Sequence, residues 1–344
     1  MGTGGAGLFV PVRDELRSPA PRERITFSGT LSRMLVVHAD RAFREHVTPE
    51  GHPECPDRFD AVLAGLADCP AVARVEAATG GDVADVVRVH DPGYVGALER
   101  LARQGGGALD PDTWLSPRSY QVALQAAGTL VRATDAALTA PPGAAERRAF
   151  AVVRPPGHHA RPAAAMGFCF FNNVAVAAAR ARAVHGLERV AIVDVDVHHG
   201  NGTQEIFWED GAVLVASVHR DRFYPGTGGK DETGAGRGKG ATLNVPLPGS
   251  TPPARYKDAL DRVLEAALRF RPQLLLVSAG FDAYRDDPVG GLGLAPEHYA
   301  WIGERLRATA DDACEGRVVA ALEGGYALDA LGELARAFVG GLGG

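Results

Sequence analysis

The segment RVAIVDVDVHHGNG (189–202) starts as a run of branched apolar residues and ends in acidic, imidazole and glycine residues. Apolar runs of this length are typical of strands that are buried on both faces of a parallel sheet. In open α/β sheets, ligands bind beyond the carboxyl ends of the strands. The segment therefore predicts a central strand, 189–197, that carries polar side chains to a functional edge.

Six other apolar runs have the same character, and segments of helical periodicity lie between many of them. With 189–197, the predicted strands are 34–39, 150–156, 212–219, 241–248, 273–280 and 317–325. The predicted helices are 56–67, 120–138, 172–186, 255–270 and 295–314. This alternation indicates an α/β fold in which helices cover both faces of a mainly parallel sheet.

The composition indicates a soluble globular protein, because 46% of the 344 residues are hydrophobic and 23% are charged. The formal net charge of −6 provides no basic field for a nucleic-acid backbone. Four cysteines without a CxxC pair argue against a cysteine-based zinc site and against a disulfide scaffold. We therefore expect a cytoplasmic protein that does not bind nucleic acid.

The first thirty residues lack the positive segment and long apolar run of a signal peptide, and no run in the chain reaches the length of a membrane span. We predict a loosely ordered leader, 1–30, followed by one catalytic domain, 31–344, with no membrane association. A homo-oligomer stays an open alternative.

Chemically active side chains follow five of the predicted strands. These segments are RPPGHH (154–159), DVDVHH (194–199), SVHR (217–220), SAGFD (278–282) and EGGY (323–326). Because the carboxyl ends of parallel strands meet at one edge of the sheet, we expect the five segments to converge there.

A divalent-metal site is the main interpretation of the central segment. In a continued strand, Asp194, Asp196 and His198 would project to one face, since side chains alternate with a period of two. Asp282 lies at another strand end, where a lone buried carboxylate would be costly. Asp196, His198 and Asp282 would hold zinc and leave an open position for water. The alternative is a set of capping side chains at a turn before a helix.

A metal held by two carboxylates acidifies its water less than a metal held only by histidines, so such a site needs a separate base. His158 and His159 are the natural candidates, and the Tyr326 phenol could donate a hydrogen bond to a substrate oxygen. The same ligand set also accepts iron(II) or cobalt(II).

Seven stretches that span nearly all of residues 34–330 carry a family resemblance. They are GHPECPDRFDAVLAGL (51–66), RPPGHHA (154–160), MGFCFFNNVAVAA (166–178), VDVDVHHGNGTQEIF (193–207), FYPGTG (223–228), SAGFDAYRDDPVGGLGL (278–294) and EGGYAL (323–328). In this order they resemble the histone deacetylase superfamily, including bacterial histone deacetylase-like and acetylpolyamine amidohydrolases. The resemblance implies a single-domain, three-layer arginase/deacetylase-like fold with about eight strands, and a zinc-dependent amidohydrolase.

The resemblance also implies a role for each catalytic residue. His159 matches the general base that activates water and then protonates the leaving amine, and His158 matches its electrostatic partner, paired with Asp194. Tyr326 matches the residue that polarises the acyl carbonyl and stabilises the oxyanion. Asn201 occupies the position where some branches of the superfamily have an aspartate that pairs with the second histidine, here His159. At this position the sequence resembles the class II branch better.

Two further sets follow from the same resemblance. Gly167, Phe168 and Tyr224 match residues that line a narrow tunnel for the acyl-amine stem. A structural potassium ion is implied at the backbone oxygens of Asp194, Asp196, His198 and Val218 and the hydroxyl of Ser217.

The expected substrate is acyl-lysine or a similar acylated amine. Val289 brings no charge to the position after Asp287-Pro288, which favours acyl-lysine over an acetylpolyamine; a small-metabolite N-acetyl substrate is also open. An arginase-like ureohydrolase would need the spacing D-x-H-x-D, whereas this chain has D-x-D-x-H. A catalytically inactive binding module is disfavoured, because every residue that the mechanism requires is present.

Overall fold

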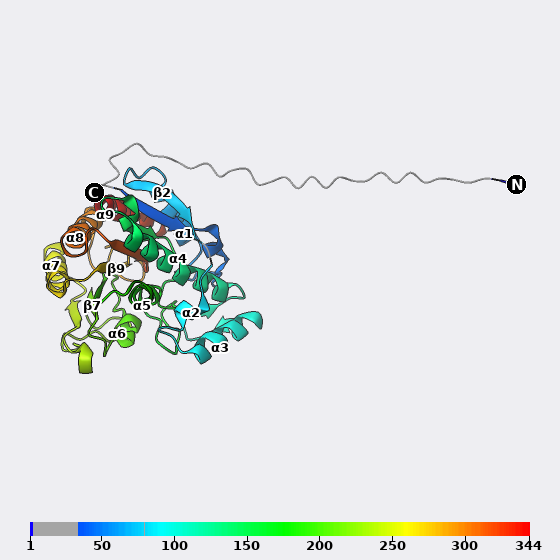
Figure 1. The fold of residues 1–344 in the computed structure, drawn as a ribbon, viewed down its shortest axis with the longest axis horizontal. Helices are drawn as coiled ribbons and strands as arrows, with labels where there is room; N and C mark the ends of the chain where they lie inside the picture. Colours follow the sequence, from blue (N-terminus) through cyan, green and yellow to red (C-terminus); the bar gives the residue numbers. More distant parts are fainter. Residues whose placement is uncertain (3–33, 79) are drawn as a thin grey trace.

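The computed structural model describes residues 1–2, 34–78 and 80–344, and a parallel sheet of eight strands runs through its centre (Figure 1). From one edge to the other, the strands are β2 (Val72–Ala77), β1 (Leu35–Ala39), β5 (Arg148–Ala151), β10 (Val318–Leu322), β9 (Leu274–Ala279), β6 (Val190–Asp194), β7 (Val213–Arg220) and β8 (Thr242–Leu247). All neighbouring pairs are parallel. The predicted α/β fold is confirmed.

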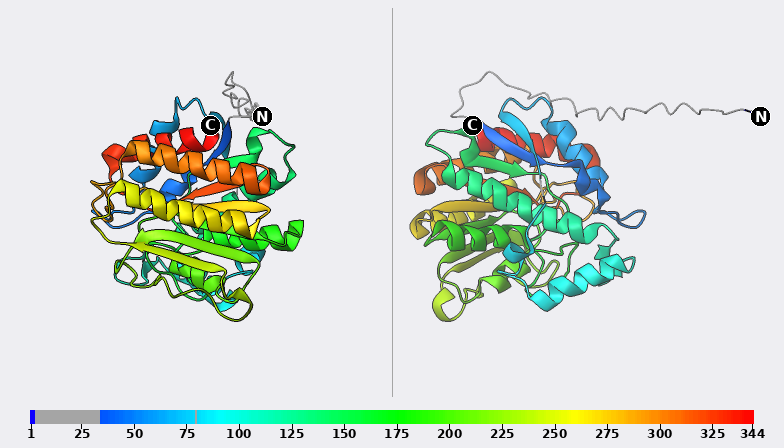
Figure 2. Two further views of the ribbon diagram at one scale, coloured as in Figure 1. Left: turned by 90° about the vertical axis from the view of Figure 1, so that its left-hand side faces the viewer. Right: turned by 45° about the vertical axis from the view of Figure 1, so that its right-hand side comes forward.

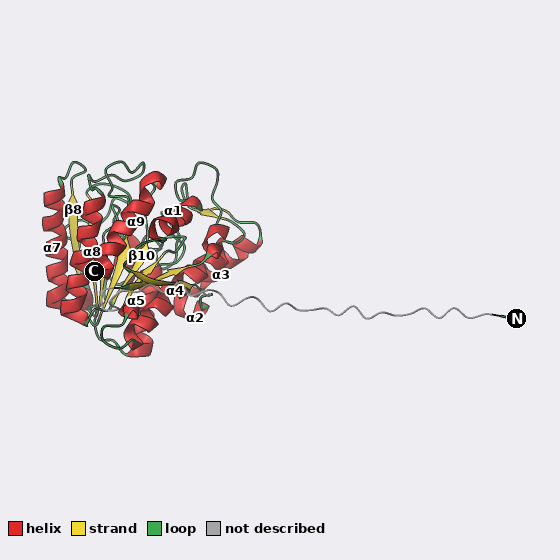
Figure 3. Cartoon of the chain, turned by 90° about the horizontal axis from the view of Figure 1, so that it is seen from above, coloured by secondary structure: helices red, strands yellow, loops and turns green. Residues whose placement is uncertain are grey.

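Helices cover both faces of this sheet, as Figures 2 and 3 show. On one face, α4 (Ser119–Thr139) packs against α5 (Asn173–His185), and both contact the central strands. The other face is covered by α1 (Asp57–Leu66), α7 (Pro253–Phe270), α8 (Pro296–Cys314) and α9 (Leu328–Gly343). Smaller elements are α2 (Val83–Val86), α3 (Pro92–Arg103), α6 (Asn201–Ile206) and the hairpin of β3 (Gly107–Ala108) and β4 (Trp114–Leu115).

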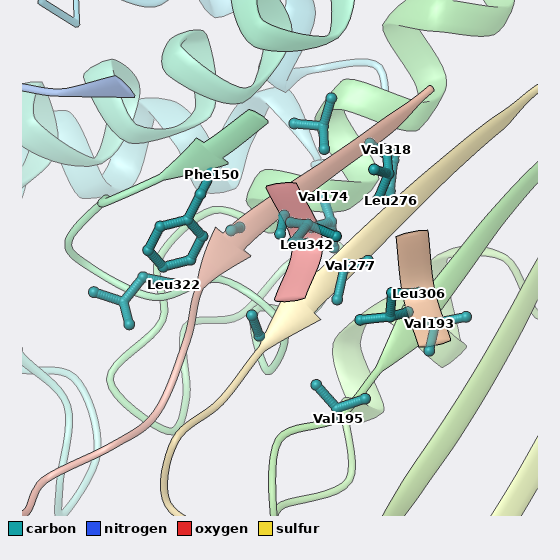
Figure 4. Close-up of a cluster of buried hydrophobic side chains, with 14 of the residues drawn as sticks. Phe150, Val174, Val193, Val195, Leu276, Val277, Leu306, Val318, Leu322 and Leu342 are labelled. Carbon is teal, nitrogen blue, oxygen red and sulfur yellow. The ribbon is translucent and has the colours of Figure 1, made fainter. Parts of the chain in front are cut away.

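The central strands are buried on both faces, which explains why they have continuous apolar sequences. Figure 4 shows Phe150 and Leu276 from the sheet in the same cluster as Val174 of α5 and Leu306 of α8, and all four are fully buried. Burial of one such side chain contributes about 1.5–3 kcal/mol to folding. The strand ends that carry polar residues are therefore held by a rigid core.

The structure differs from the predicted elements in two places that matter. β2 was not among the predicted strands, because it is a largely half-exposed edge strand whose sequence, VARVEA, includes charged residues. The predicted strand 189–197 ends at Asp194, where the Asp194 side chain accepts a hydrogen bond from the Asp196 N–H at 3.0 Å. The expectation that Asp194, Asp196 and His198 share one strand face is thus wrong.

The predicted leader, 1–30, lies outside the described residues apart from its first two. Within the part of the chain that the structure describes, no helix has both the length and the apolar character needed to cross a membrane.

Candidate active site

The loops after β5, β6, β7, β9 and β10 meet around a cavity of about 180 Å³ at one edge of the sheet. It is much smaller than the pockets that hold drug-sized ligands, so it suits a narrow, unbranched group. The lining consists of Asp112, Pro156, His158, His159, Gly167, Phe168, His198, Phe223, Tyr224, Val289, Gly324 and Tyr326. The predicted convergence of the strand ends is therefore present.

Asp196, His198 and Asp282 form a buried cluster at this cavity, and their ligand atoms all lie within 4.8 Å of one another. His198 Nδ1 lies 3.0 Å from Asp196 Oδ1 and 3.1 Å from Asp282 Oδ2. Burial and the charge of Asp196 raise the pKa of Asp282 to about 7, because two carboxylates repel each other in a dry site. A divalent cation between them would remove that repulsion.

The remaining carboxylate contacts also favour a cation in this cluster. Asp282 Oδ1 accepts the Val197 N–H at 3.0 Å, whereas its buried Oδ2 accepts no well-formed hydrogen bond from the described residues. Asp196 Oδ2 accepts the Gly324 N–H at 2.8 Å. A Cβ at Gly324 would overlap Asp282 Oδ2, so only glycine lets this backbone approach the cluster. The donor set, two carboxylates and one imidazole, is one that zinc accepts.

The adjacent histidines have different partners. His158 Nδ1 lies 2.9 Å from Asp194 Oδ2; burial disfavours the charged ring, but the carboxylates of Asp194 and Asp196 outweigh burial and raise the pKa of His158 to about 10. His159 Nδ1 lies 2.8 Å from Asn201 Oδ1, and burial together with the charge of His158 lowers the pKa of His159 well below its usual value. One ring is therefore charged and its neighbour neutral.

The hydrogen bond to Asn201 also determines which nitrogen of His159 carries the proton. An amide oxygen only accepts hydrogen bonds, so His159 Nδ1 must donate to it. In the neutral ring the lone pair then resides on Nε2. Asn201 and Asp194 lie outside the cavity lining, where they orient the two rings without contacting the cavity.

The predicted tunnel residues line the same cavity. The Tyr224 ring meets His159 edge-on with centroids 5.1 Å apart, and the Phe168 ring meets Tyr326 at 5.9 Å. Gly167 has a φ of 55°, and a Cβ there would overlap the His159 ring, so both conformation and space require glycine. Phe168, with a φ of 68°, takes a conformation that bulky residues rarely adopt.

Tyr326 is 8% exposed and lies on the cavity wall. Burial raises its pKa well above the usual value, and Arg58, 4.8 Å from the ring centroid, opposes the shift only in part. The phenol therefore keeps its proton at neutral pH and can act as a hydrogen-bond donor.

The residues of the expected potassium site lie at and just after the end of β6 and within the neighbouring strand β7. Asp194, the last residue of β6, is opposite Ser217 of β7, and Val218 follows in the same strand. The Ser217 hydroxyl lies 2.8 Å from Nδ1 of His219.

Several residues of the site were not identified from the sequence, among them Pro156 and Gly324, which line the cavity. Asp112 and Phe223 line the cavity, and the Phe223 ring stacks on His198 with centroids 5.2 Å apart. Buried Glu323 accepts hydrogen bonds from the N–H groups of Gly157 and His158 at 2.7 and 3.2 Å, and so holds the turn before the two histidines. The glutamate in EGGY was a visible signal, whereas Asp112 lies in a loop between α3 and α4 that follows no predicted strand.

Comparisons with known proteins agree with this geometry. The model of the Histone deacetylase domain matches residues 52–342. A histone deacetylase-like amidohydrolase of Pseudomonas aeruginosa is 42% identical over 282 residues, which cover 80% of this chain and 73% of the relative.

Two crystal structures are also similar. The HDA15 HD domain has a TM-score of 0.82 and 36% identity, with 90% of each chain covered. An acetylpolyamine aminohydrolase from Burkholderia pseudomallei has a TM-score of 0.79 and 29% identity, covering 90% of this chain and 98% of the other. With a family model that matches most of the chain and relatives above 30% identity, the chain belongs to the histone deacetylase family of hydrolases.

Proposed function

We propose that this protein is a zinc-dependent deacetylase that hydrolyses the amide of acyl-lysine or a similar acylated amine. The observation that carries the proposal is a narrow cavity on which a buried Asp–His–Asp cluster, a neutral histidine and a protonated tyrosine converge. A metal, a base and an oxyanion donor are the three parts of metal-assisted amide hydrolysis by water.

Asp196, His198 and Asp282 would hold the metal, and zinc, iron(II) and cobalt(II) all suit these ligands. When bound, the ion supplies a Lewis acid that polarises the acyl carbonyl and acidifies water. The two carboxylates offset its charge, so proton removal by a protein base is still needed.

His159 is the proposed base, and its Nε2 takes the proton of the attacking water. The hydrogen bond from Nδ1 to Asn201 fixes the ring so that the lone pair of Nε2 is available. The same Nε2 then gives its proton to the leaving amine when the carbon–nitrogen bond breaks. His158, held protonated by Asp194, stays charged and stabilises the negative charge that develops in the cavity.

Tyr326 donates its phenol O–H to the oxygen of the acyl carbonyl as negative charge develops there. Phe168 and Tyr224 pack beside Tyr326 and His159 and limit the cavity to the acyl group and an unbranched stem. We also propose that a structural potassium ion binds the backbone oxygens of Asp194, Asp196, His198 and Val218 with the Ser217 hydroxyl.

The proposal is tested by a turnover panel of acetyl-lysine peptides, longer acyl-lysine peptides and acetylpolyamines, with wild type and Asp282→Ala. We expect wild type to hydrolyse at least one class and Asp282→Ala to hydrolyse none. Absence of wild-type turnover on the whole panel would contradict the proposed function.

Asp112 is the residue that we expect to influence the choice among these substrates. Its carboxylate lines the cavity and accepts a hydrogen bond from the Thr113 hydroxyl at 3.0 Å. Such a carboxylate can pair with a distal ammonium of the substrate or accept a backbone N–H of the substrate. It thereby supplies the negative charge that Val289 does not provide. Asp112→Asn is expected to raise KM for acetylpolyamines about fivefold, the loss of one partly exposed ion pair.

The KM for a neutral acyl-lysine substrate should change less than the KM for acetylpolyamines in the same variant. Asp312→Asn, which neutralises an exposed carboxylate on α8, is the control for net charge. Equal changes of KM in both variants would show that Asp112 has no specific role.

Asn201→Asp is expected to shift the acid limb of the kcat/KM profile to higher pH. A carboxylate at this position would stabilise the protonated His159 ring and so raise its pKa. The base acts only when neutral, so activity is lost as pH falls through that pKa, and a higher pKa moves the loss upward. The measurement is kcat/KM across pH for wild type and variant, and an unchanged acid limb would contradict the assignment of His159 as base.

A further inference from the structure

We propose that Asp287 is the positioning residue that places Tyr326 for the reaction, an inference that rests on the proposed function. Tyr326 lies in the loop after β10, and Asp287 lies in the loop that follows Asp282 after β9. The two residues are 39 positions apart in sequence, and a carboxylate bridge joins them.

Asp287 uses both carboxylate oxygens to connect the two loops. Oδ2 accepts the N–H groups of Tyr326 and Ala327 at 2.7 and 3.2 Å. Oδ1 accepts the N–H groups of Val289 and Gly290, each at 2.9 Å. One side chain thereby satisfies four backbone donors, which only a group with two accepting oxygens can do.

Tyr326 directly precedes Ala327, the N-cap residue of α9, so its N–H makes no hydrogen bond within the helix. Ala327, the N-cap residue of that helix, has no side chain that could accept a hydrogen bond. Free N–H groups at a helix N-terminus require acceptors, and a negative charge is stabilised there. Asp287 supplies the acceptor oxygen and the negative charge from a different loop. It thereby fixes the main chain from which the phenol extends.

The bridge also sets Tyr326 relative to the rest of the site. The Gly291 N–H donates to the Asp282 carbonyl at 2.7 Å, which closes the Asp287 loop onto the metal cluster, and Val289 of the same loop lines the cavity. The Tyr326 ring otherwise contacts Phe168 and the Arg58 guanidinium, and a ring can rotate or slide against both. On the preceding side, Arg58 Nε donates to the Gly325 carbonyl at 2.7 Å and so holds the main chain before Tyr326. Asp287 holds the Tyr326 N–H itself and the residue after it, so it completes the placement of the phenol relative to the cluster.

Asp287→Asn tests this role with little change in size. The amide has one accepting oxygen, so the N–H groups of one loop lose their acceptor. We expect kcat to fall about tenfold to a hundredfold, with KM changed less than twofold, because a small displacement of a catalytic group has effects of this size. Asp286→Asn changes the neighbouring exposed carboxylate and is the matched control, with kcat expected to stay at the wild-type value.

A double-mutant cycle with Tyr326→Phe separates positioning from general damage. If Asp287 acts through the phenol, Asp287→Asn should cause little further loss of kcat in the Tyr326→Phe background. The same fold-loss in both backgrounds, or loss of bound metal in Asp287→Asn alone, would overturn the inference. So would a kcat of Asp287→Asn within twofold of wild type.

A spectroscopic measurement keeps the test independent of turnover. With 3-fluorotyrosine incorporated at position 326, the fluorine resonance should shift or broaden in Asp287→Asn and stay unchanged in Asp286→Asn. An unchanged resonance in Asp287→Asn would overturn the inference even if wild type hydrolysed no acyl-amine. The fluorine resonance thus tests the role of Asp287, whereas the substrate panel tests the proposed function.

Discussion

Tyr326→Phe is expected to lower kcat about a hundredfold to a thousandfold, the usual loss when one oxyanion donor is removed. The phenol is buried and protonated on the cavity wall, and phenylalanine keeps the ring contacts with Phe168 and Arg58 while it removes the donor. The measurement is steady-state turnover of an acetyl-lysine peptide, with bound metal determined on the same preparation.

Metal content is the control for this variant, because the Tyr326 hydroxyl is not part of the Asp196–His198–Asp282 cluster. We expect it to equal that of wild type, with KM changed only slightly. A variant that retains more than about a tenth of wild-type kcat would contradict the role of Tyr326 as the oxyanion donor.

Asp282→Ala is expected to remove the metal and, with it, turnover. Mutation of a residue that only hydrogen-bonds to a metal ligand already lowers metal affinity or activity about 10- to 100-fold. Loss of a ligand itself should therefore lower metal affinity more. The two remaining groups, Asp196 and His198, cannot complete the set of three protein ligands that a catalytic zinc site uses. Metal analysis after dialysis and turnover on the same substrate provide the measurement.

Thermal unfolding gives an independent readout of the same change. A metal that binds only the folded state raises the melting temperature, so added zinc should stabilise wild type and leave Asp282→Ala unchanged. Asp286→Ala, which changes an exposed carboxylate of the same loop, should respond like wild type. Equal stabilisation of all three proteins by zinc would contradict the placement of the metal at Asp282.

Much of the fold could be predicted from local patterns. All seven predicted strands and all five predicted helices are present, because buried parallel strands must be continuously apolar and their helices must have an apolar stripe. The edge strand β2, the β3–β4 hairpin and the helices α2, α3, α6 and α9 were missed. β2 is half-exposed and partly charged, and its strand conformation depends on pairing with β1.

The sequence by itself determined which chemical groups reach the edge of the sheet, since the carboxyl ends of parallel strands meet at one edge. It did not determine how those groups pair. The strand that was expected to extend to residue 197 ends at Asp194, so that Asp194 meets His158 while Asp196 turns toward Asp282.

Only the tertiary structure brought Asp112 to the cavity and Asp287 to the backbone of Tyr326. Both contacts join loops that are distant in sequence, and the path of a loop is set by the packing of the elements at its ends rather than by a periodic pattern within it. The sequence motifs therefore identify the chemical groups of this site, whereas the packing of the core determines how the loops arrange these groups.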